Sequence, residues 1–169
     1  VTMKTLTLEN IYRIISYGVV GNVIDLDIAL FEWGQTREPY QSFYGQITAT
    51  EVSTWWDEYY PRVFAPNIRV FLGDTDVNQS LLTTLHANPE RFWYFNNGIT
   101  AICSSITKKI VGAGSRETGI FECKSFRIVN GAQTVGAIAL VASTHPDEIE
   151  KARVPIRLIS LDGCPTGFD

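Results

Sequence analysis

The chain has 169 residues and a net charge of −4, from 14 Lys and Arg against 18 Asp and Glu. This length suits one compact domain with a sizeable core, and 45% hydrophobic with 19% charged residues excludes a disordered, collagen-like or coiled-coil chain. The acidic balance also argues against a dedicated DNA-wrapping surface, which needs clustered Lys and Arg.

The charges are unevenly distributed along the chain. Residues 1–60 hold three basic and eight acidic residues, whereas residues 61–127 hold eight basic and five acidic residues. Residues 128–169 hold three basic and five acidic residues. The basic middle of the chain is therefore the segment that we expect to receive an anion.

The chain has three cysteines, Cys103, Cys123 and Cys164. Their number is odd and none forms a CxxC pair, so we expect core residues in a reducing cytoplasm and no disulfide framework. The only histidines, His86 and His145, are far apart in the sequence, and we therefore predict no metal site. The uncharged stretch 128–146 contains several polar residues and is interpreted as a buried strand and helix, so we expect no membrane partner.

The first residues of the chain predict a helix and a strand pair. Apolar residues at helical spacing predict a helix over 8–15. Alternating β-branched residues predict a strand over 19–30, followed by a turn over 33–39 and a returning strand over 40–47.

Two helices are predicted next. Thr48 and Glu51 fit a capping box, in which the Thr48 hydroxyl accepts from the Glu51 amide and the Glu51 side chain reaches back. The helix that follows ends by Pro61 and carries four aromatic residues, Trp55, Trp56, Tyr59 and Tyr60. Asp76 is predicted to cap a second helix that ends at Asn88-Pro89.

The second half of the chain completes a mixed pattern. Strands are predicted over 99–110 and 121–129, joined by a glycine-rich turn at 112–119. A helix over 133–143 and a last strand over 154–161 follow. We therefore predict an α/β fold, a mixed sheet with flanking helices.

Asn67 to Gly73 form the first of three segments that differ from ordinary core. A single arginine, Arg69, lies there within an apolar run. A buried arginine needs an anionic partner, because an unpaired one costs several kcal/mol. The alternative is that Arg69 lies on the exposed face of a half-buried strand.

In the second segment, four consecutive aromatic residues run into Asn96, Asn97 and Gly98. Asn and Gly adopt positive φ readily, so this is a sharp backbone feature. A hairpin turn is the structural alternative. The two side-chain amides are suited to reading a base edge, orienting a water or binding a sugar hydroxyl.

In the third segment, an apolar strand stops at Asn130 and Gly131, and a helix of small residues begins with Gln133 and Thr134 close to its start. A tight strand-to-helix turn directs backbone N–H groups and the positive end of a helix at one place, which favours an anion. The alternative is a purely structural turn with Asn130 as the helix cap.

These segments together resemble the AIPR family, the abortive-infection phage-resistance proteins of bacteria. The resemblance rests on NIRVFLG, FWYFNNGIT and IVNGAQT between Asn67 and Thr134. It implies a role in phage defence, often near restriction–modification loci, and brings no established reaction with it. Because members of the family are usually longer, we expect the chain to be a fragment: one α/β domain over 1–169, with an acidic portion over 1–60 and a motif-bearing core over 61–161.

A weaker resemblance connects the last strand–turn–helix–strand element to the ParB/sulfiredoxin superfamily and its DGQHR-type relatives. In that superfamily the corresponding turn holds nucleotide phosphates. Here Gln133-Thr134 stands where the relatives carry His-Arg or Arg-Arg. The missing arginine removes a phosphate clamp, although Arg69, Arg127 or Arg157 are candidates to replace its charge.

We therefore expect a phage-defence domain that binds a nucleotide or a nucleic-acid phosphate at the two turns. The predicted ligand-binding residues are Arg69, Asn96, Asn97, Gly98, Asn130, Gly131, Gln133 and Thr134. One alternative is a Mg²⁺-dependent nuclease or nucleotide hydrolase, for which Asp74 and Asp76 are the nearest carboxylates. Another is an interaction module that packs against a partner or the remainder of the longer chain.

Overall fold

The structure is a computed structural model that describes residues 23–66, 68, 76–110 and 115–164. Its strands are β1 (Leu26–Thr36), β2 (Ser42–Thr48), β3 (Ile99–Cys103), β4 (Ser105–Lys108), β5 (Thr118–Lys124), β6 (Arg127–Asn130) and β7 (Arg153–Ser160). Its helices are α2 (Ala49–Tyr59), α3 (Asp76–Ala87), the 3₁₀ helix η1 (Pro89–Phe95), α4 (Ala132–Thr144) and α5 (Pro146–Ile149). The helix predicted over 8–15 lies outside the described residues.

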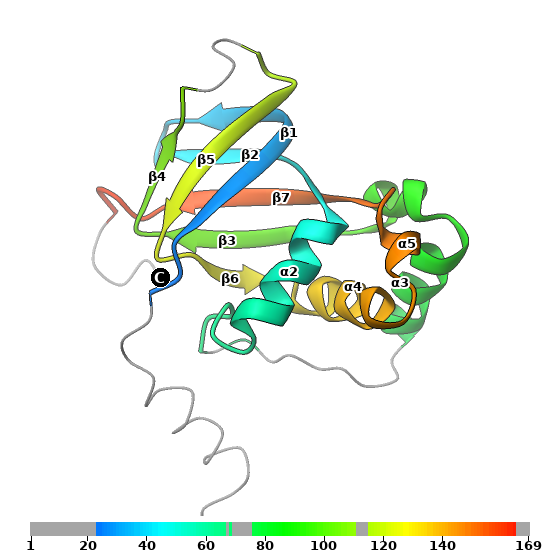
Figure 1. Cartoon of the computed structure of the whole chain (residues 1–169). Helices are drawn as coiled ribbons and strands as arrows, with labels where there is room; N and C mark the ends of the chain where they lie inside the picture. The colour runs from blue at the N-terminus through cyan, green and yellow to red at the C-terminus, as the bar shows by residue number, and fades with distance from the viewer. Residues whose placement is uncertain (1–22, 67, 69–75, 111–114, 165–169) are drawn as a thin grey trace, which may run out of the picture.

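The seven strands form one mixed sheet in the order β4-β5-β1-β2-β7-β3-β6. Neighbouring strands are antiparallel except for β3 and β7, which run parallel. Figure 1 shows α2 and α4 in front of the sheet, with α3 and α5 beyond its right-hand end. The predicted α/β class is confirmed. Among the described residues, no helix is long and apolar enough to cross a membrane.

The first strand extends further than predicted. β1 continues to Thr36, so the turn expected over 33–39 is wrong in its first half. A β-bulge at Glu32, where φ is 48°, redirects the strand. The Trp33 ring then packs edge-on against Phe121, with 5.3 Å between the ring centroids. Burial of that large ring outweighs the local turn signal.

The strands predicted over 99–110 and 121–129 each break into two. Ser104 separates β3 from β4, and Ser125, with φ 53°, lies between β5 and β6. The Ser104 amide donates to the Lys124 carbonyl over 2.8 Å, so the two breaks lie side by side and form a corner. Because β3 pairs with β7 while β5 pairs with β1, this corner makes the sheet curl back on itself.

The start of α2 confirms half of the predicted capping box. The Thr48 hydroxyl accepts from the Glu51 amide over 3.1 Å. The Glu51 carboxylate instead receives a hydrogen bond from the Ala29 backbone in β1, and burial raises the pKa of Glu51 to about 7. The first turn of α2 is thereby attached to the sheet as well as capped.

The core lies between the sheet and the helices, and α4 is the central helix. It packs against α2, α3 and α5. The small residues Ala132, Gly136 and Ala137 of α4 are buried, which allows the helix to pack closely against its neighbours. Trp55 of α2 is 2% exposed and its ring lies 4.9 Å from that of Phe126.

The cysteines belong to this core only in part. Cys103 and Cys123 are buried, Cys164 is partly exposed, and all three thiols are free. A hydrogen bond with the Cys123 thiol, together with burial, raises the pKa of Cys103 far above its usual range. Cys103 is therefore an unreactive core group at neutral pH.

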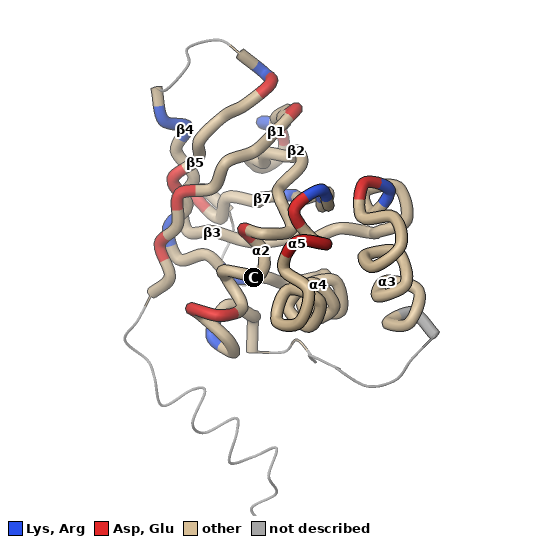
Figure 2. The backbone as a smooth tube through the Cα atoms, turned by 45° about the vertical axis from the view of Figure 1, so that its right-hand side comes forward, with Lys and Arg blue, Asp and Glu red and all other residues tan. Residues whose placement is uncertain are grey.

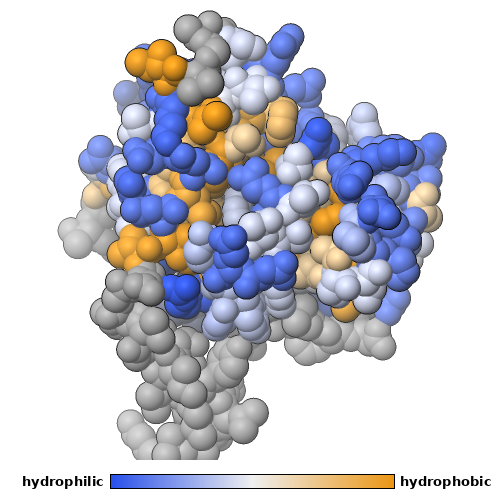
Figure 3. All heavy atoms as spheres, in the orientation of Figure 1, coloured by the Kyte–Doolittle hydropathy of each residue, from blue (hydrophilic) through white to orange (hydrophobic). Residues whose placement is uncertain are grey.

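The face of the helices that is seen in Figure 3 is mainly polar. Figure 3 shows hydrophobic residues gathered over the β1, β4 and β5 end of the molecule, whereas the part formed by the helices is mostly hydrophilic. At the strand-rich end, Val23 and Ile110 are 65% and 92% exposed, and each adjoins a segment outside the described residues.

Candidate ligand-binding site

The two turns predicted to form one site do meet in space. The Asn96 side chain donates from Nδ2 to the Thr134 hydroxyl over 3.0 Å. Its Oδ1 accepts the Gly98 backbone amide. Thr100, two residues after Gly98, pairs across β3 and β6 with Asn130. One polar contact and one strand pairing therefore join the segments 96–100 and 130–134.

Two glycines allow this close approach. Gly98 has φ +78° and Gly131 has φ +99°, a region that other residues rarely adopt. A Cβ on Gly131 would lie 2.6 Å from the Gly98 carbonyl oxygen, and one on Gly98 would overlap the Pro155 carbonyl oxygen. Three backbone segments thus stack here without side chains between them.

The structure corrects two local alternatives. The aromatic run before Asn96 is the 3₁₀ helix η1, and β3 begins at Ile99, so a hairpin at Asn96–Gly98 is wrong. The N-cap of α4 is Gly131, with no side-chain cap, so Asn130 as the cap is also wrong. Asn130 instead accepts the Gly131 amide through Oδ1 over 2.8 Å.

Burial separates the predicted site residues into two groups. Thr134 is 5% exposed and Gly98 is buried, so these residues shape the turns and present little surface to a ligand. Asn97 and Asn130 are exposed, and Gln133 is partly exposed. Within the two turns, these three amide side chains are the ones available for ligand contact.

A row of side chains leads from the turns across the sheet. The strand registers place Asn130, Thr100, Arg157 and Tyr44 side by side on β6, β3, β7 and β2. This face is opposite to the buried side chains of β7, such as Ile156. Tyr44 is 50% exposed and Arg157 is exposed. An amide, a hydroxyl, a guanidinium and an aromatic ring therefore share one accessible face.

A pocket of about 410 Å³ lies on this face. It is lined by Glu32, Tyr44, Gly45, Gln46, Trp93, Asn97, Ile99, Pro155, Ile156 and Arg157. Asn97 thus brings the first turn to the rim of a cavity built mostly by β2 and β7, with Trp93 from η1. Glu32, the acidic member of the lining, accepts a hydrogen bond from Gln46 Nε2 over 2.7 Å.

Several lining residues were not predicted, or only as a source of charge. The sequence predicts neither Tyr44 nor Trp93 as a ligand contact, and it predicts Arg157 only as a possible counter-charge. In β7, Pro155 and Arg157 alternate with apolar residues, and this pattern indicates that Arg157 lies on the exposed face of the strand. The pattern does not indicate which strands lie beside β7, and therefore it does not predict that Tyr44 is a neighbour of Arg157.

Two lysines of the basic middle of the chain are paired with acidic side chains. Lys109 pairs with Asp27, and Lys124 pairs with Asp25 at 3.3 Å and with Glu122 at 3.2 Å. Figure 2 shows these blue and red segments intermingled along β1, β4 and β5. The acidic N-terminal portion thus neutralises lysines of the middle. No described acidic side chain forms an ion pair with Arg157, which comes from the acidic last part of the chain.

Three predicted residues cannot be placed in the site. Arg69 and Asp74 lie outside the described residues. Asp76 is the first residue of α3, which confirms the predicted helix, but its side chain is not described, so its predicted role as the cap stays a prediction. The predicted counter-charge from Arg69 and the carboxylates proposed for Mg²⁺ therefore stay predictions.

Comparison with known proteins gives one match. A family model described as AIPR protein matches residues 64–165, which is more than half of the chain and includes both turns and β7. No curated protein and no solved structure matches. The similarity of the strand–turn–helix element to the ParB/sulfiredoxin superfamily therefore stays a prediction.

Proposed function

The chain belongs to the AIPR family of abortive-infection phage-resistance proteins, and we propose that its domain binds a nucleotide or a nucleic-acid phosphate beside the two joined turns. The observation that carries this proposal is the pocket that Asn97 shares with Trp93, Tyr44 and Arg157. These four side chains supply an amide, two aromatic rings and one cation to a single accessible cavity.

Each of these groups matches a part of a nucleotide. Aromatic rings stack on bases, which contributes about 1–3 kcal/mol per base in single-stranded complexes. Trp93 is 38% exposed, so part of its ring is available for stacking. The Asn97 amide has the donor and acceptor needed to read a base edge. The Arg157 guanidinium binds phosphate in a bidentate manner.

The charges of the pocket also favour one orientation of a bound nucleotide. Glu32 disfavours a phosphate at its end of the pocket, because two negative charges repel. We therefore expect the phosphate near Arg157, and the base near Glu32. The Glu32 carboxylate can there accept a hydrogen bond from an exocyclic amino group.

The two turns have a supporting role in this proposal. Asn96, Gly98, Gly131 and Thr134 hold β3 and the start of α4 together, so that Asn97 is presented at the rim. Asn130 and Gln133 lie at the N-terminus of α4, and the positive end of the helix dipole there favours a second phosphate of a bound oligonucleotide. A chain of nucleotides is thus expected to cross from the pocket toward α4.

The test is direct binding by the purified protein. Fluorescence anisotropy with labelled single-stranded DNA and RNA, and calorimetry with ATP, CTP and GTP, measure the two ligand classes separately. We expect Arg157→Ala to weaken binding at least about tenfold and to lower the salt slope by about one. Arg37→Ala is the matched control, because Arg37 is also exposed but does not line the pocket.

Equal weakening by both arginine variants, or no binding by the wild type, contradicts the proposal. Cleavage of the oligonucleotides in Mg²⁺ that is lost in Asp74→Ala supports the nuclease alternative. If no ligand binds but the protein associates with a partner through the exposed aromatics of η1, the domain is an interaction module.

A further inference from the structure

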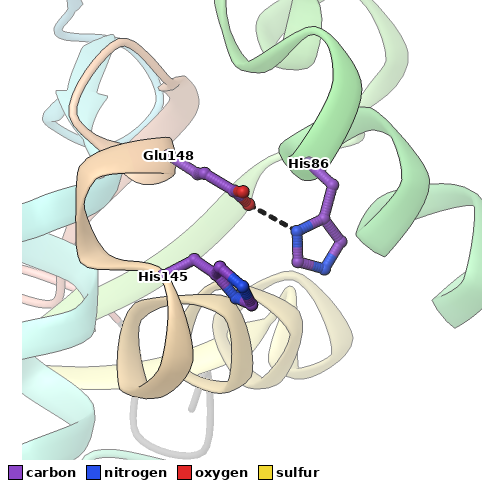
Figure 4. A group of neighbouring side chains, drawn as sticks. All are labelled: His86, His145 and Glu148. Carbon is purple, nitrogen blue, oxygen red and sulfur yellow. Dashed lines mark hydrogen bonds and ion pairs between the residues drawn. The ribbon is translucent and has the colours of Figure 1, made fainter.

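A cluster of metal-ligating side chains lies among the helices, and none of its members lines the pocket. His86 belongs to the last turn of α3, His145 joins α4 to α5, and Glu148 belongs to α5. Figure 4 shows the three side chains meeting, with His86 Nδ1 in contact with a Glu148 carboxylate oxygen. One ligand atom from each residue lies within 4.8 Å of the other two.

The backbone around this cluster is held by buried neighbours. Leu85, which precedes His86, is 0% exposed, and Ile149, which follows Glu148, is 2% exposed. The His145 amide donates to the Val141 carbonyl over 2.7 Å, and the Glu148 amide donates to the His145 carbonyl over 3.1 Å. The three side chains therefore start from fixed positions on packed helices, which favours a preorganised site.

A second contact orients one of the imidazoles. The Thr144 hydroxyl lies 2.9 Å from His145 Nδ1. Metal-binding histidines usually have such a partner on one ring nitrogen, which fixes the ring and leaves the other nitrogen for the metal. The rings of His86 and His145 lie edge-on, with centroids 5.4 Å apart.

The donor set selects a class of cation. Two imidazoles and one carboxylate match Zn²⁺ and similar divalent ions, whereas Mg²⁺ and Ca²⁺ prefer oxygen ligands alone. Ligand atoms of a tetrahedral zinc site lie about 3.3 Å apart for metal–ligand bonds of about 2.0–2.1 Å. The ligand atoms, which lie within 4.8 Å of one another, approach to this spacing when an ion binds.

We propose that His86, His145 and Glu148 bind one zinc-class divalent cation, with water in the fourth position. An ion pair between His86 and Glu148 alone contributes little, because their side chains are 43% and 33% exposed. It also leaves the His145 side chain with only its contacts to Thr144 and to the His86 ring. A bound ion uses all three side chains, replaces the His86–Glu148 hydrogen bond, and clamps the end of α3 to the α4–α5 junction.

The experiment uses the purified protein after removal of any polyhistidine tag. Zn²⁺ is titrated in competition with a chromophoric chelator, and Co²⁺ is used as a spectroscopic probe. We expect one equivalent to bind, a higher melting temperature with Zn²⁺, and a Co²⁺ spectrum without thiolate charge transfer. The chain has only two histidines, so both imidazole resonances should broaden when Co²⁺ binds.

Matched variants make the result decisive. Glu148→Gln should weaken zinc binding at least about tenfold, whereas Glu150→Gln, an equal charge change at an exposed neighbour, should not. His145→Asn should abolish the Co²⁺ spectrum, and Cys164→Ser should leave it unchanged. Circular dichroism checks that each variant is folded. Absence of stoichiometric binding by folded wild type, broadening of only one imidazole, or equal affinity in Glu148→Gln and Glu150→Gln overturns the proposal.

Discussion

Asn96 connects two distant parts of the chain through one side chain: its amide nitrogen donates to the Thr134 hydroxyl over 3.0 Å, and its amide oxygen accepts the Gly98 backbone N–H. The contact joins the end of η1, the start of β3 and the first turn of α4. Because Thr134 is almost fully buried, its hydroxyl depends on this partner. The geometry of both turns therefore rests on Asn96.

Replacing Asn96 should reduce stability more than replacing its neighbour. In Asn96→Ala the Thr134 hydroxyl and the Gly98 amide lose their partner, which costs about 1–3 kcal/mol. Asn97→Ala should change stability by less than about 0.5 kcal/mol, because Asn97 is exposed. Urea unfolding measures both. Equal stability of the two variants would show that the Asn96 contact is dispensable.

A second comparison tests the close approach of the two turns. Gly131→Ala places a Cβ 2.6 Å from the Gly98 carbonyl oxygen, in addition to an unfavourable φ. Gly163 also has positive φ (+76°), but no atom lies within 4 Å of the position that a Cβ would take there. Gly163→Ala therefore isolates the backbone cost of about 1–2 kcal/mol. We expect Gly131→Ala to lower the melting temperature clearly more. Similar melting temperatures would contradict the stacking of these backbones.

Glu51 should give the protein a measurable pH dependence of stability. Its pKa is raised from 4.5 to about 7 in the folded chain, mainly by burial, so the native state holds a proton that the unfolded chain releases. This contribution is fully present below about pH 4.5 and is lost as the pH rises to about 7. At 1.36 kcal/mol per pKa unit, the loss amounts to about 3 kcal/mol.

The corresponding variant is Glu51→Gln, which keeps the shape of the side chain but does not titrate. Its free energy of unfolding should vary less between about pH 4.5 and 7 and should exceed that of the wild type above this range. Asp57→Asn, on the exposed side of the same helix, controls for the loss of one negative charge. The same pH profile in wild type and Glu51→Gln would show that Glu51 titrates normally.

Trp93 provides a test of base stacking. Trp93→Ala should weaken binding of single-stranded oligonucleotides by about 1–3 kcal/mol. Tyr94→Ala is the control, because Tyr94 is 73% exposed and does not line the pocket. Anisotropy titrations at fixed salt compare the two variants. If Tyr94→Ala weakens binding as much as Trp93→Ala, the aromatic run acts as a general surface and not through the pocket.

Local signals predicted most of the regular structure. The cap at Thr48, the start of α3 at Asp76 and the helix of small residues after Gly131 all follow from nearest neighbours in the sequence, and all are observed. The predictions failed where contacts between distant parts of the chain decide where a strand ends. Trp33 continues β1 because its ring packs against Phe121, and the corner at Ser104 exists because β3 and β4 pair with different parts of the sheet.

The candidate sites show the same division. The order of the residues was sufficient to predict the family, the α/β class and the turns at Gly98 and Gly131, because motifs, periodicity and turn chemistry are short-range properties. The folded chain was needed to show that Lys109 and Lys124 are neutralised, that Arg157 lies beside Tyr44, and that the two histidines meet Glu148. These contacts join elements that are far apart in the chain. The order of the strands and the packing of the helices bring their side chains together.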